Sequence, residues 1–468
     1  MSEEFRPADV ATDIGFTHPD VIRARFAHAI SNMYRREVPQ YGTLVDLVAE
    51  VNAKALGADH DILRGNSTVA ARLEVERHGA IRLGTPEELH TVRRIFAVMG
   101  MHPVGYYDLS TAGVPVHSTA FRPVEAASLA FNPFRIFTSL LRLELIKDAE
   151  LRETAAQILR ARSIFTLRAL ALTAQHEAEG GLGDSEANEF VREVLQTFRW
   201  HEVATVDAPT YRKLLEAHRL IADVVCFKGP HINHLTPRTL DIDAAQIEMS
   251  RRGIVAKDVI EGPPARAVPI LLRQTSFKAL EEMIRFCGTR EADGAHTARF
   301  GEIEQRGLAL TRKGRALYDR LLGEARAMDV ADSTASEYAA RLVKAFTAFP
   351  DDLVTLRREG LGFFRYVLRA GALADGRFDV GDLEALIVEG VVEAQPITYE
   401  DFLPVSAAGI FQSNLSDTEQ RAYSATAAQH QFEETLGATV LDEISLYETE
   451  QAASIDEVCR QLQQRVRA

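Results

Sequence analysis

Three short segments of the chain concentrate residues that bind metal ions and anions. They are Glu76–Arg82, Gly229–Arg238 and His296–Gln305, which combine imidazoles, carboxylates and arginines. The middle segment places His231 and His234 three residues apart between prolines. Imidazoles and carboxylates are metal ligands, and arginines bind anions, so the three segments together hold the parts for one metal ion and one anionic ligand.

The residues 76–84 alternate in character at a period of two, which is typical of a β-strand. Ile81 and Leu83 are expected to pack inward, while His78 and Arg82 lie on the opposite face, about 13 Å apart along the strand. A short diacid bound to a metal at His78 would reach the arginine with its far end. A surface strand that carries ordinary polar residues would show the same pattern, so the strand alone leaves both interpretations open.

The composition is that of a folded, acidic protein. The chain has 468 residues, of which 46% are hydrophobic and 26% charged, and its formal net charge is 53 − 67 = −14. This balance argues against a nucleic-acid-binding protein, which needs a basic face for phosphate contacts. A small anionic substrate is still compatible, because local arginines act at short range.

The cysteines and the N-terminus favour a reducing compartment. The three cysteines, Cys226, Cys287 and Cys459, are far apart and form no C-x-x-C motif, so neither a disulfide framework nor a zinc–thiolate site is expected. The first residues are polar and acidic, and no run of about 18 apolar residues occurs. We therefore expect a cytoplasmic protein without a membrane segment.

The first part of the chain predicts helices followed by a small mixed sheet. The spacing of apolar residues predicts two helices over 20–52. Thr85, followed by proline and two glutamates, predicts a capped helix start. The stretches 104–109 and 116–122 are expected to be strands, which gives a βαβββ-type module.

The stretch from about residue 124 to 220 is expected to be mostly helical, and a second sheet module is expected to follow it in the chain. The residues 134–145 are expected to form one apolar helical stripe, and 221–227 a buried strand. The pattern then predicts a strand over 269–276, a helix over 277–286 and a strand over 294–306 that carries Glu302.

The expected architecture is α+β, a mixed β-sheet core of two modules with helical additions. The regions are a first sheet module with N-terminal helices (19–123), a helical insertion (124–220), a second sheet module (221–312) and a C-terminal helical region (313–468). The small residues of the loop 399–411 allow a close backbone approach to a ligand, and a tightly packed strand end would have the same composition.

The usual signatures of several enzyme classes are missing from the sequence. There is no G-x-S-x-G, no phosphate-binding Walker loop and no G-x-G-x-x-G. A mononuclear site of two histidines and one carboxylate is the remaining candidate, and such sites suit Fe(II) oxygenases because they leave coordination positions open. With 14 histidines in the chain, spacing alone does not select the ligands.

Several long blocks of the sequence closely resemble the bacterial 2-oxoadipate dioxygenase/decarboxylase family. The resemblance extends from about residue 19 to about residue 451. The matching blocks are Arg77–Arg82, Val104–Ser110, Val114–Arg122, Phe227–Asp243, His296–Gly307 and Asp401–Phe411.

The resemblance implies a fold related to the vicinal-oxygen-chelate enzymes and a specific set of site residues. Fe(II) would be held by His78, His234 and Glu302. His78 would also contact the substrate, and Arg82 would bind its distal carboxylate as the catalytic arginine. The backbone of Val405 and Ser406 would lie beside the substrate. His231 and Glu304 are interpreted as supporting or structural neighbours of the ligands.

The reaction implied by the resemblance joins 2-oxoadipate and O₂ to give 2-hydroxyglutarate, expected in its R (D) form, and CO₂, a step of lysine breakdown. Both oxygen atoms enter the products, so no separate 2-oxoglutarate cosubstrate is needed. Two other classes stay open. One is a metal-dependent isomerase or lyase that uses the ion as a Lewis acid, and the other is a non-catalytic binding protein for a dicarboxylic 2-oxo acid. The oligomeric state is undetermined by the sequence.

Overall fold

The computed structural model describes residues 15–57, 72–110, 113–277, 279–288, 294–327, 334–369, 382–403 and 427–466. The chain divides into two compact units, each assembled from separate chain segments. The first unit draws on Met1–Lys257, Thr275–Glu304 and Pro404–Val440, and the second on Asp258–Gln274, Gln305–Leu403 and Leu441–Ala468. The four regions expected from the sequence stay a prediction.

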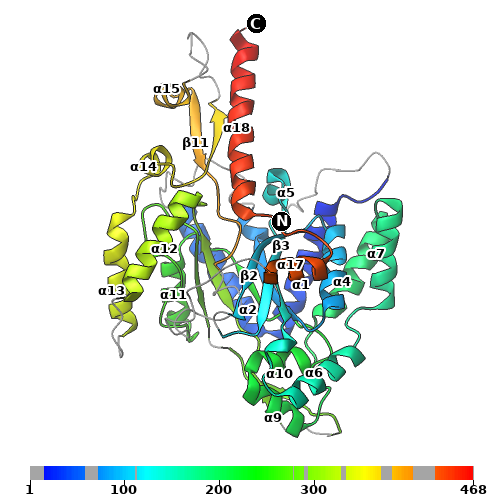
Figure 1. The fold of residues 1–468 in the computed structure, drawn as a ribbon. Coiled ribbons are helices and arrows are strands. Elements are labelled where there is room, and N and C mark those ends of the chain that lie inside the picture. The colour runs from blue at the N-terminus through cyan, green and yellow to red at the C-terminus, as the bar shows by residue number, and fades with distance from the viewer. Residues whose placement is uncertain are drawn as a thin grey trace. The chain divides into compact units, whose positions relative to one another are not determined.

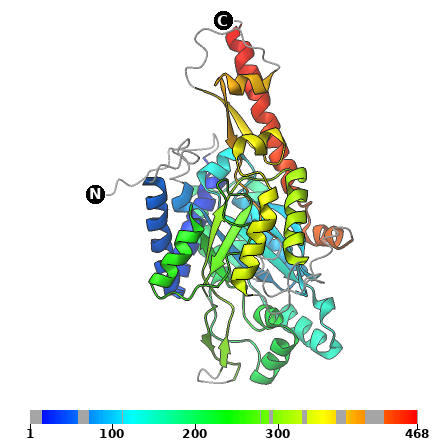
Figure 2. The same ribbon diagram turned by 90° about the vertical axis from the view of Figure 1, so that its left-hand side faces the viewer.

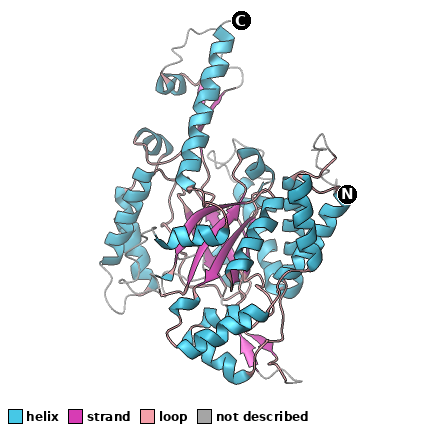
Figure 3. Ribbon diagram, turned by 45° about the vertical axis from the view of Figure 1, so that its right-hand side comes forward, coloured by secondary structure: helices cyan, strands magenta, loops and turns pink. Residues whose placement is uncertain are grey.

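A mixed five-stranded sheet is the centre of the first unit (Figure 3). Its strands are β1 (Arg77–Leu83), β2 (His102–Asp108), β3 (Val116–Arg122), β4 (Arg135–Leu141) and β5 (His234–Pro237). Their order in the sheet is β2-β3-β4-β1-β5. β1 pairs in parallel with β4 and antiparallel with β5, so β1 lies inside the sheet with a partner on each side.

Helices surround this sheet, and together with it they give the α+β class expected from the sequence (Figure 1). The helices of the first unit are α1 (Pro19–Glu37), α2 (Pro39–Gly57), α4 (Pro86–Val98), α5 (Ala126–Phe131), α6 (Ala149–Ala161), α7 (Leu167–Glu179), α8 (Asp184–Leu195), α9 (Ala208–Ala217), α10 (Arg219–Val225), α11 (Ile242–Arg251) and α17 (Ala427–Leu436). Short 3₁₀ turns follow β4 at Leu143–Leu145 and α8 at Gln196–Phe198.

The alternation in β1 separates a core face from a polar face. Ile81 and Leu83 are completely buried in the apolar cluster that they share with residues of α1, α2 and α4. Because side chains alternate along a strand, His78, Ala80 and Arg82 occupy the opposite face. This confirms the strand predicted over 76–84 and its inward-facing residues.

Local sequence signals fix the starts of the helices next to the sheet. At α4, the Thr85 hydroxyl accepts a hydrogen bond from the Glu88 amide (3.2 Å), and proline occupies the first turn, as predicted. At α1, the His18 side chain accepts from the Asp20 amide, and Arg35 and Arg36 lie in the last turn. The two helices predicted over 20–52 are confirmed as α1 and α2.

The second unit consists mainly of helices and one antiparallel strand pair. It contains α12 (Arg312–Ala327), α13 (Ala335–Ala345), the 3₁₀ turn Phe346–Ala348, α14 (Leu353–Arg358), β10 (Phe364–Leu368), α15 (Leu383–Val388), β11 (Val392–Pro396) and α18 (Glu443–Val466). β10 and β11 pair antiparallel, and α18 lies along β10 (Figure 2). Outside this unit, β7 (Glu282–Ile284) pairs with β8 (Gly294–His296) in the first unit, and β6 (Leu272–Ser276) pairs with β9 (Glu302–Arg306), whose residues are divided between the two units.

Two predicted elements within apolar runs have the wrong type. The stretch 134–145 was expected to be helical but contains β4, in which every residue is buried. A strand covered on both faces shows a continuous apolar run rather than alternation. The stretch 221–227 was expected to be a strand, but α10 covers most of it, and the His218 side chain accepts from the Leu220 amide at its start. Periodicity cannot distinguish these two cases in a run this short.

The expected helix over 277–286 is also wrong. The chain there forms β7, which pairs with β8, and the Leu280 amide donates to the Arg299 carbonyl (2.8 Å). The single strand predicted over 294–306 is divided into β8 and β9, and Glu302 begins β9 as expected for a strand residue. The strand predicted over 269–276 is confirmed as β6. Within the described residues, no helix has both the length and the apolar composition needed to cross a membrane.

A buried carboxylate holds the start of β1 in the sheet. Glu76 is fully buried, and its carboxylate contacts Arg72 (2.9 Å), Arg135 (2.9 Å) and Arg238 (3.0 Å). Burial alone would raise the pKa of Glu76, but the three arginines hold that pKa well below its usual range. Since Arg135 belongs to β4 and Arg238 follows β5, Glu76 connects β1 to both of its sheet neighbours.

We expect Glu76→Gln to lower the free energy of unfolding by about 3–5 kcal/mol at neutral pH, because removing one partner leaves buried charges uncompensated. Denaturant unfolding at pH 7 measures this change. Glu153→Gln is the matched control, since Glu153 forms an exposed ion pair with Arg160, and its loss is expected to have no measurable effect.

The same contribution depends on pH in a defined direction. The folded-state pKa of Glu76 is lower than the unfolded value of about 4.3. The stabilisation is therefore complete above that unfolded value and is lost as the pH falls through the folded-state pKa. The stabilities of the native protein and of Glu76→Gln should converge in acid, and a difference that stays constant with pH would contradict this account.

Candidate metal centre

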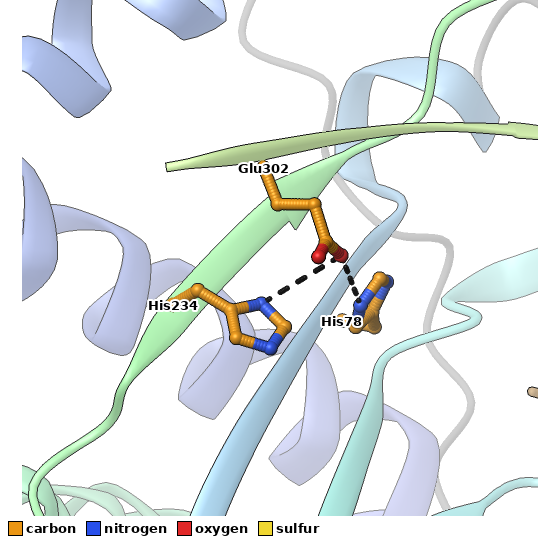
Figure 4. A group of neighbouring side chains, drawn as sticks. All are labelled: His78, His234 and Glu302. Atoms are coloured by element: carbon orange, nitrogen blue, oxygen red, sulfur yellow. Dashed lines mark ion pairs between the residues drawn. The ribbon is translucent and has the colours of Figure 1, made fainter. Parts of the chain in front are cut away.

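Three buried side chains from three strands point toward one another on the polar face of the sheet (Figure 4). They are His78 of β1, His234 of β5 and Glu302 of β9. One potential ligand atom from each lies within 4.8 Å of the others. The structure thus brings together the two histidines and the carboxylate named by the sequence resemblance, although 224 positions separate His78 from Glu302 in the chain.

Strand pairing places the two histidines diagonally across one ladder. In the antiparallel pair of β1 and β5, His78 is opposite Thr236 and Ala80 is opposite His234. Residues two positions apart on a strand share a face. The two imidazole rings are therefore neighbours, with centroids 5.3 Å apart and planes nearly perpendicular.

Backbone contacts bring Glu302 to the same place. The Phe300 amide donates to the Asn233 carbonyl (3.1 Å), and the Thr239 amide donates to the Glu304 carbonyl (2.7 Å). These bonds join the two ends of β5 to the segment around Glu302. The Tyr34 hydroxyl of α1 donates to the carbonyls of Asn233 (3.1 Å) and Phe300 (2.8 Å), so the core helix also supports the site.

His78 lies between two carboxylates. Its Nε2 is 3.2 Å from Glu302 Oε1, and its Nδ1 is 2.9 Å from Glu304 Oε2. Burial lowers the pKa of His78, but the carboxylates of Glu304 and Glu302 outweigh burial and raise the pKa above its ordinary value. The position next to Nε2 therefore favours a positive charge.

Hydrogen bonds fix the tautomer of His234. The Thr236 hydroxyl donates to Glu302 Oε1 (3.1 Å) and lies 2.9 Å from His234 Nδ1. Because the hydroxyl proton is directed to Glu302, Nδ1 must donate to Thr236, and this assigns the unprotonated lone pair to Nε2. Burial lowers the pKa of His234 to about 4, so the ring is neutral at physiological pH.

These residues fit a divalent metal ion. His234 Nε2 is buried and has no hydrogen-bond partner within the part of the chain that the structure describes. Glu304 Oε2 lies 2.9 Å from His78 Nδ1, and a carboxylate at that nitrogen favours a proton on Nδ1, which leaves Nε2 as the metal-binding atom. Two imidazoles and one carboxylate form the donor set of non-haem Fe(II) oxygenases, and they leave coordination positions for a substrate.

Arg82 lies on the same face of β1 as His78, four residues further along the strand. Its side chain is 13% exposed, and its Nη1 is 2.6 Å from Asp223 Oδ2. Two residues from the sequence analysis join the same group: His231 Nε2 and His296 Nε2 lie 3.1 Å and 2.9 Å from Asp223 Oδ1. His231 thus contacts the partner of Arg82, whereas Glu304 contacts His78 directly.

Sequence reasoning missed two residues that the structure places at these contacts. Thr236 connects His234 to Glu302, and Asp223 connects Arg82 to two histidines. Asp223 could have been found from the sequence, because it is the single acidic residue in the apolar run Ile221–Phe227 and a buried acid needs a partner. The predicted substrate contacts at Val405 and Ser406 lie outside the described residues.

Comparisons with known proteins identify the family of the chain. A family model described as 2-oxoadipate dioxygenase/decarboxylase matches residues 26–414. A protein of that name from Pseudomonas putida is 56% identical over 454 residues, which is 95% of this chain and 97% of the relative. One from Escherichia coli is 57% identical over 436 residues, 92% and 96% of the two chains.

Solved structures agree as well. The crystal structure of the hydroxyglutarate synthase from Pseudomonas putida in complex with 2-oxoadipate matches with a TM-score of 0.89 and 54% identity. The match covers 95% of this chain and 99% of that chain.

The buried group of two histidines and one carboxylate has the donor set that suits a metal-dependent oxygenase. The chain belongs to the 2-oxoadipate dioxygenase/decarboxylase family.

We expect Glu304→Gln to weaken Fe(II) binding about 10- to 100-fold, the usual cost of losing a carboxylate that supports a metal-binding histidine. Glutamine keeps the size and an acceptor for His78 Nδ1 but removes the charge. Anaerobic Fe(II) titration against a competing chelator measures the affinity. Glu177→Gln, at an exposed ion pair with Arg94, is the control, and an unchanged affinity in Glu304→Gln would contradict the role given to Glu304.

Proposed function

We propose that this chain is an Fe(II)-dependent enzyme that converts 2-oxoadipate and dioxygen into 2-hydroxyglutarate and carbon dioxide. The observation that carries the proposal is the convergence of His78, His234 and Glu302 in a buried group on one sheet face. The family membership supports the dioxygenase and decarboxylase activity, and the relative solved with 2-oxoadipate supports the substrate.

In this proposal His78 Nε2, His234 Nε2 and a Glu302 oxygen hold the iron. A bound Fe(II) would supply chelation of the 2-oxo acid end of the substrate and activation of dioxygen. The protein contributes one carboxylate and two neutral imidazoles, so iron and ligands together carry a net charge of +1, which favours the binding of an anionic 2-oxo acid.

The remaining residues hold these ligands and exclude water. Glu304 beside Nδ1 of His78 and Thr236 beside Nδ1 of His234 favour a proton on each Nδ1. In this proposal the Nε2 lone pair of each ring is then available to the iron. The three ligand side chains are nearly inaccessible to solvent, with exposures of 0–1%. A dry site strengthens the electrostatic interactions between these groups and the bound substrate.

Arg82 would bind the distal carboxylate of the substrate. Arg82 lies on the same face of β1 as His78, four residues away. The strand backbone therefore fixes the distance from this cation to the proposed iron ligand. A guanidinium can grip a carboxylate through two parallel hydrogen bonds. The backbone of Val405 and Ser406 completes the substrate contacts in this proposal.

We also propose that the architecture is of the vicinal-oxygen-chelate type. The described order β1-α4-β2-β3-α5-β4 is a βαβββ module with one short extra helix. The strands β5 to β9, which supply His234 and Glu302, would correspond to the second module.

The experiment that tests the function is anaerobic loading with Fe(II), followed by 2-oxoadipate and oxygen. We expect oxygen uptake and CO₂ release in a 1:1 ratio, as the reaction balance requires, and 2-hydroxyglutarate as the product. His234→Ala, checked for folding by circular dichroism, should lose both signals because one ligand is missing.

Two outcomes would contradict the proposal. Turnover without oxygen uptake would favour an isomerase or lyase that uses the metal as a Lewis acid. Undiminished turnover in folded His234→Ala would exclude the proposed ligand set.

We expect Arg82→Lys to reduce kcat/KM for 2-oxoadipate about 10- to 100-fold, because an ammonium group cannot replace the two-point grip and a hydrogen bond to a charged group contributes about 1.5–3 kcal/mol. Steady-state oxygen uptake measures the change. Arg160→Lys, at an exposed position, is the matched control. Equal kcat/KM in the Arg82→Lys variant would refute the role assigned to Arg82.

A further inference from the structure

The carboxylate of Asp223 lies at the centre of a second buried polar group, next to the proposed metal site. All four of its closest polar contacts are side chains. Arg82 Nη1 (2.6 Å) and Asn233 Nδ2 (3.4 Å) contact Oδ2, while His296 Nε2 (2.9 Å) and His231 Nε2 (3.1 Å) contact Oδ1. A carboxylate has about four lone-pair positions, so these contacts define its orientation.

The two histidines are themselves held in place by neighbouring groups. His296 Nδ1 lies 2.9 Å from the Tyr211 hydroxyl. Trp200 packs edge to face against His231, with ring centroids 4.7 Å apart, and stacks with His296 at 6.2 Å. The group thus forms a rigid support that ends at the guanidinium of Arg82.

The contact between Asp223 and Arg82, at 2.6 Å, is the shortest of the four and joins a carboxylate to a guanidinium. Burial would raise the pKa of Asp223, but His231 and Arg82 hold it well below its usual range, so Asp223 is an anion. Burial also lowers the pKa of His231, so this ring is a weaker counter-charge than a guanidinium. Arg82 is then the permanent cation that neutralises this buried carboxylate.

We propose that Asp223 is the positioning residue that sets the place of the Arg82 guanidinium, and thereby makes the enzyme select a 2-oxo acid with a second carboxylate at the right chain length. This inference rests on the proposed binding of the distal carboxylate by Arg82. An arginine side chain has several rotatable bonds, so without a fixed partner its guanidinium would accept diacids of different lengths.

The same residues could also be read as a second metal site, since Asp223, His231 and His296 offer two imidazoles and a carboxylate within 4.8 Å. Arg82 argues against a cation there. Its guanidinium already contacts Asp223 at 2.6 Å, and a divalent ion at the same carboxylate would face this charge at short range in a buried environment. The assignment therefore predicts one metal ion per chain.

The test compares iron-loaded native protein with Asp223→Asn and Arg82→Ala on four acids: 2-oxoadipate, the shorter 2-oxoglutarate, the longer 2-oxopimelate and 2-oxohexanoate, which lacks the distal carboxylate. An acid that is not turned over is measured as a competitive inhibitor. We expect Asp223→Asn to lower kcat/KM for 2-oxoadipate about tenfold or more, mainly through KM, and to affect 2-oxohexanoate far less. The preference for 2-oxoadipate over the shorter and longer diacids should fall by a similar factor.

A double-mutant cycle separates positioning from a general structural effect. If Asp223 acts through Arg82, then Asp223→Asn should add little to the loss caused by Arg82→Ala. Asp223→Glu retains the charge but moves the carboxylate, so it should keep the preference for diacids over 2-oxohexanoate while changing the order of the diacids.

The possible failures are distinguishable. If Arg82→Ala retains the preference for diacids, the proposed role of Arg82 is wrong and this inference falls with it. Two outcomes would overturn only the inference about Asp223, provided that Arg82→Ala loses the preference for diacids. In the first, Asp223→Asn retains that preference. In the second, Asp223→Asn loses activity equally on all four acids. A second metal ion per chain that disappears in Asp223→Asn would also overturn it.

If Asp223→Asn does not fold, milder substitutions among its neighbours test the same proposal. Tyr211→Phe removes the hydroxyl that holds His296 and leaves the buried charges in place. It should reduce the preference for 2-oxoadipate in the same direction, though less. An unchanged order of the four acids in folded Tyr211→Phe and His231→Gln would count against the proposal.

Discussion

The burial of His78 between two carboxylates is the constraint on which the rest of the site depends. A buried imidazole between Glu302 and Glu304 is stable only with a positive charge nearby, either a proton or a metal ion. This requirement explains why the donor atoms converge and why the pKa of His78 is raised despite its burial. The polar face of the sheet is thus built to hold a cation.

The strand β1 combines the two chemical functions of the proposed site. It carries His78 and Arg82 on one face, and its other face is fixed in the apolar core by Ile81 and Leu83. Glu76 ties the start of the strand to arginines from both neighbouring strands. Since a strand is nearly inextensible, the backbone sets the distance between His78, the proposed metal ligand, and Arg82, the proposed anion-binding arginine, and only the arginine side chain needs further restraint.

A large part of the chain's local structure was predictable because its signals are local. The alternation in 76–84, the capped helix after Thr85 and the spacing over 20–52 each produce the element that they predict. Two of the errors occur in short buried apolar runs, in which periodicity does not distinguish a helix from a strand. The stretch 134–145 contains a central strand, and most of 221–227 is a helix. In both, a short apolar run does not indicate whether the element is a helix or a strand.

The sequence by itself determined the residue types, the strand that carries His78 and Arg82, and, through long blocks of resemblance, the family. Spacing within the sequence did not determine which of the 14 histidines meet, because the ladder between β1 and β5 and the backbone bonds around Glu302 join residues far apart in the chain. His78 and His234 were named only through the resemblance. The resemblance named His234 and not His231 as a ligand, and the tertiary structure gives the physical difference: His234 Nδ1 lies 4.0 Å from Glu302, and His231 Nε2 lies 3.1 Å from Asp223. The two histidines are three residues apart, but they lie in different hydrogen-bond networks, and such networks depend on which strands pack together.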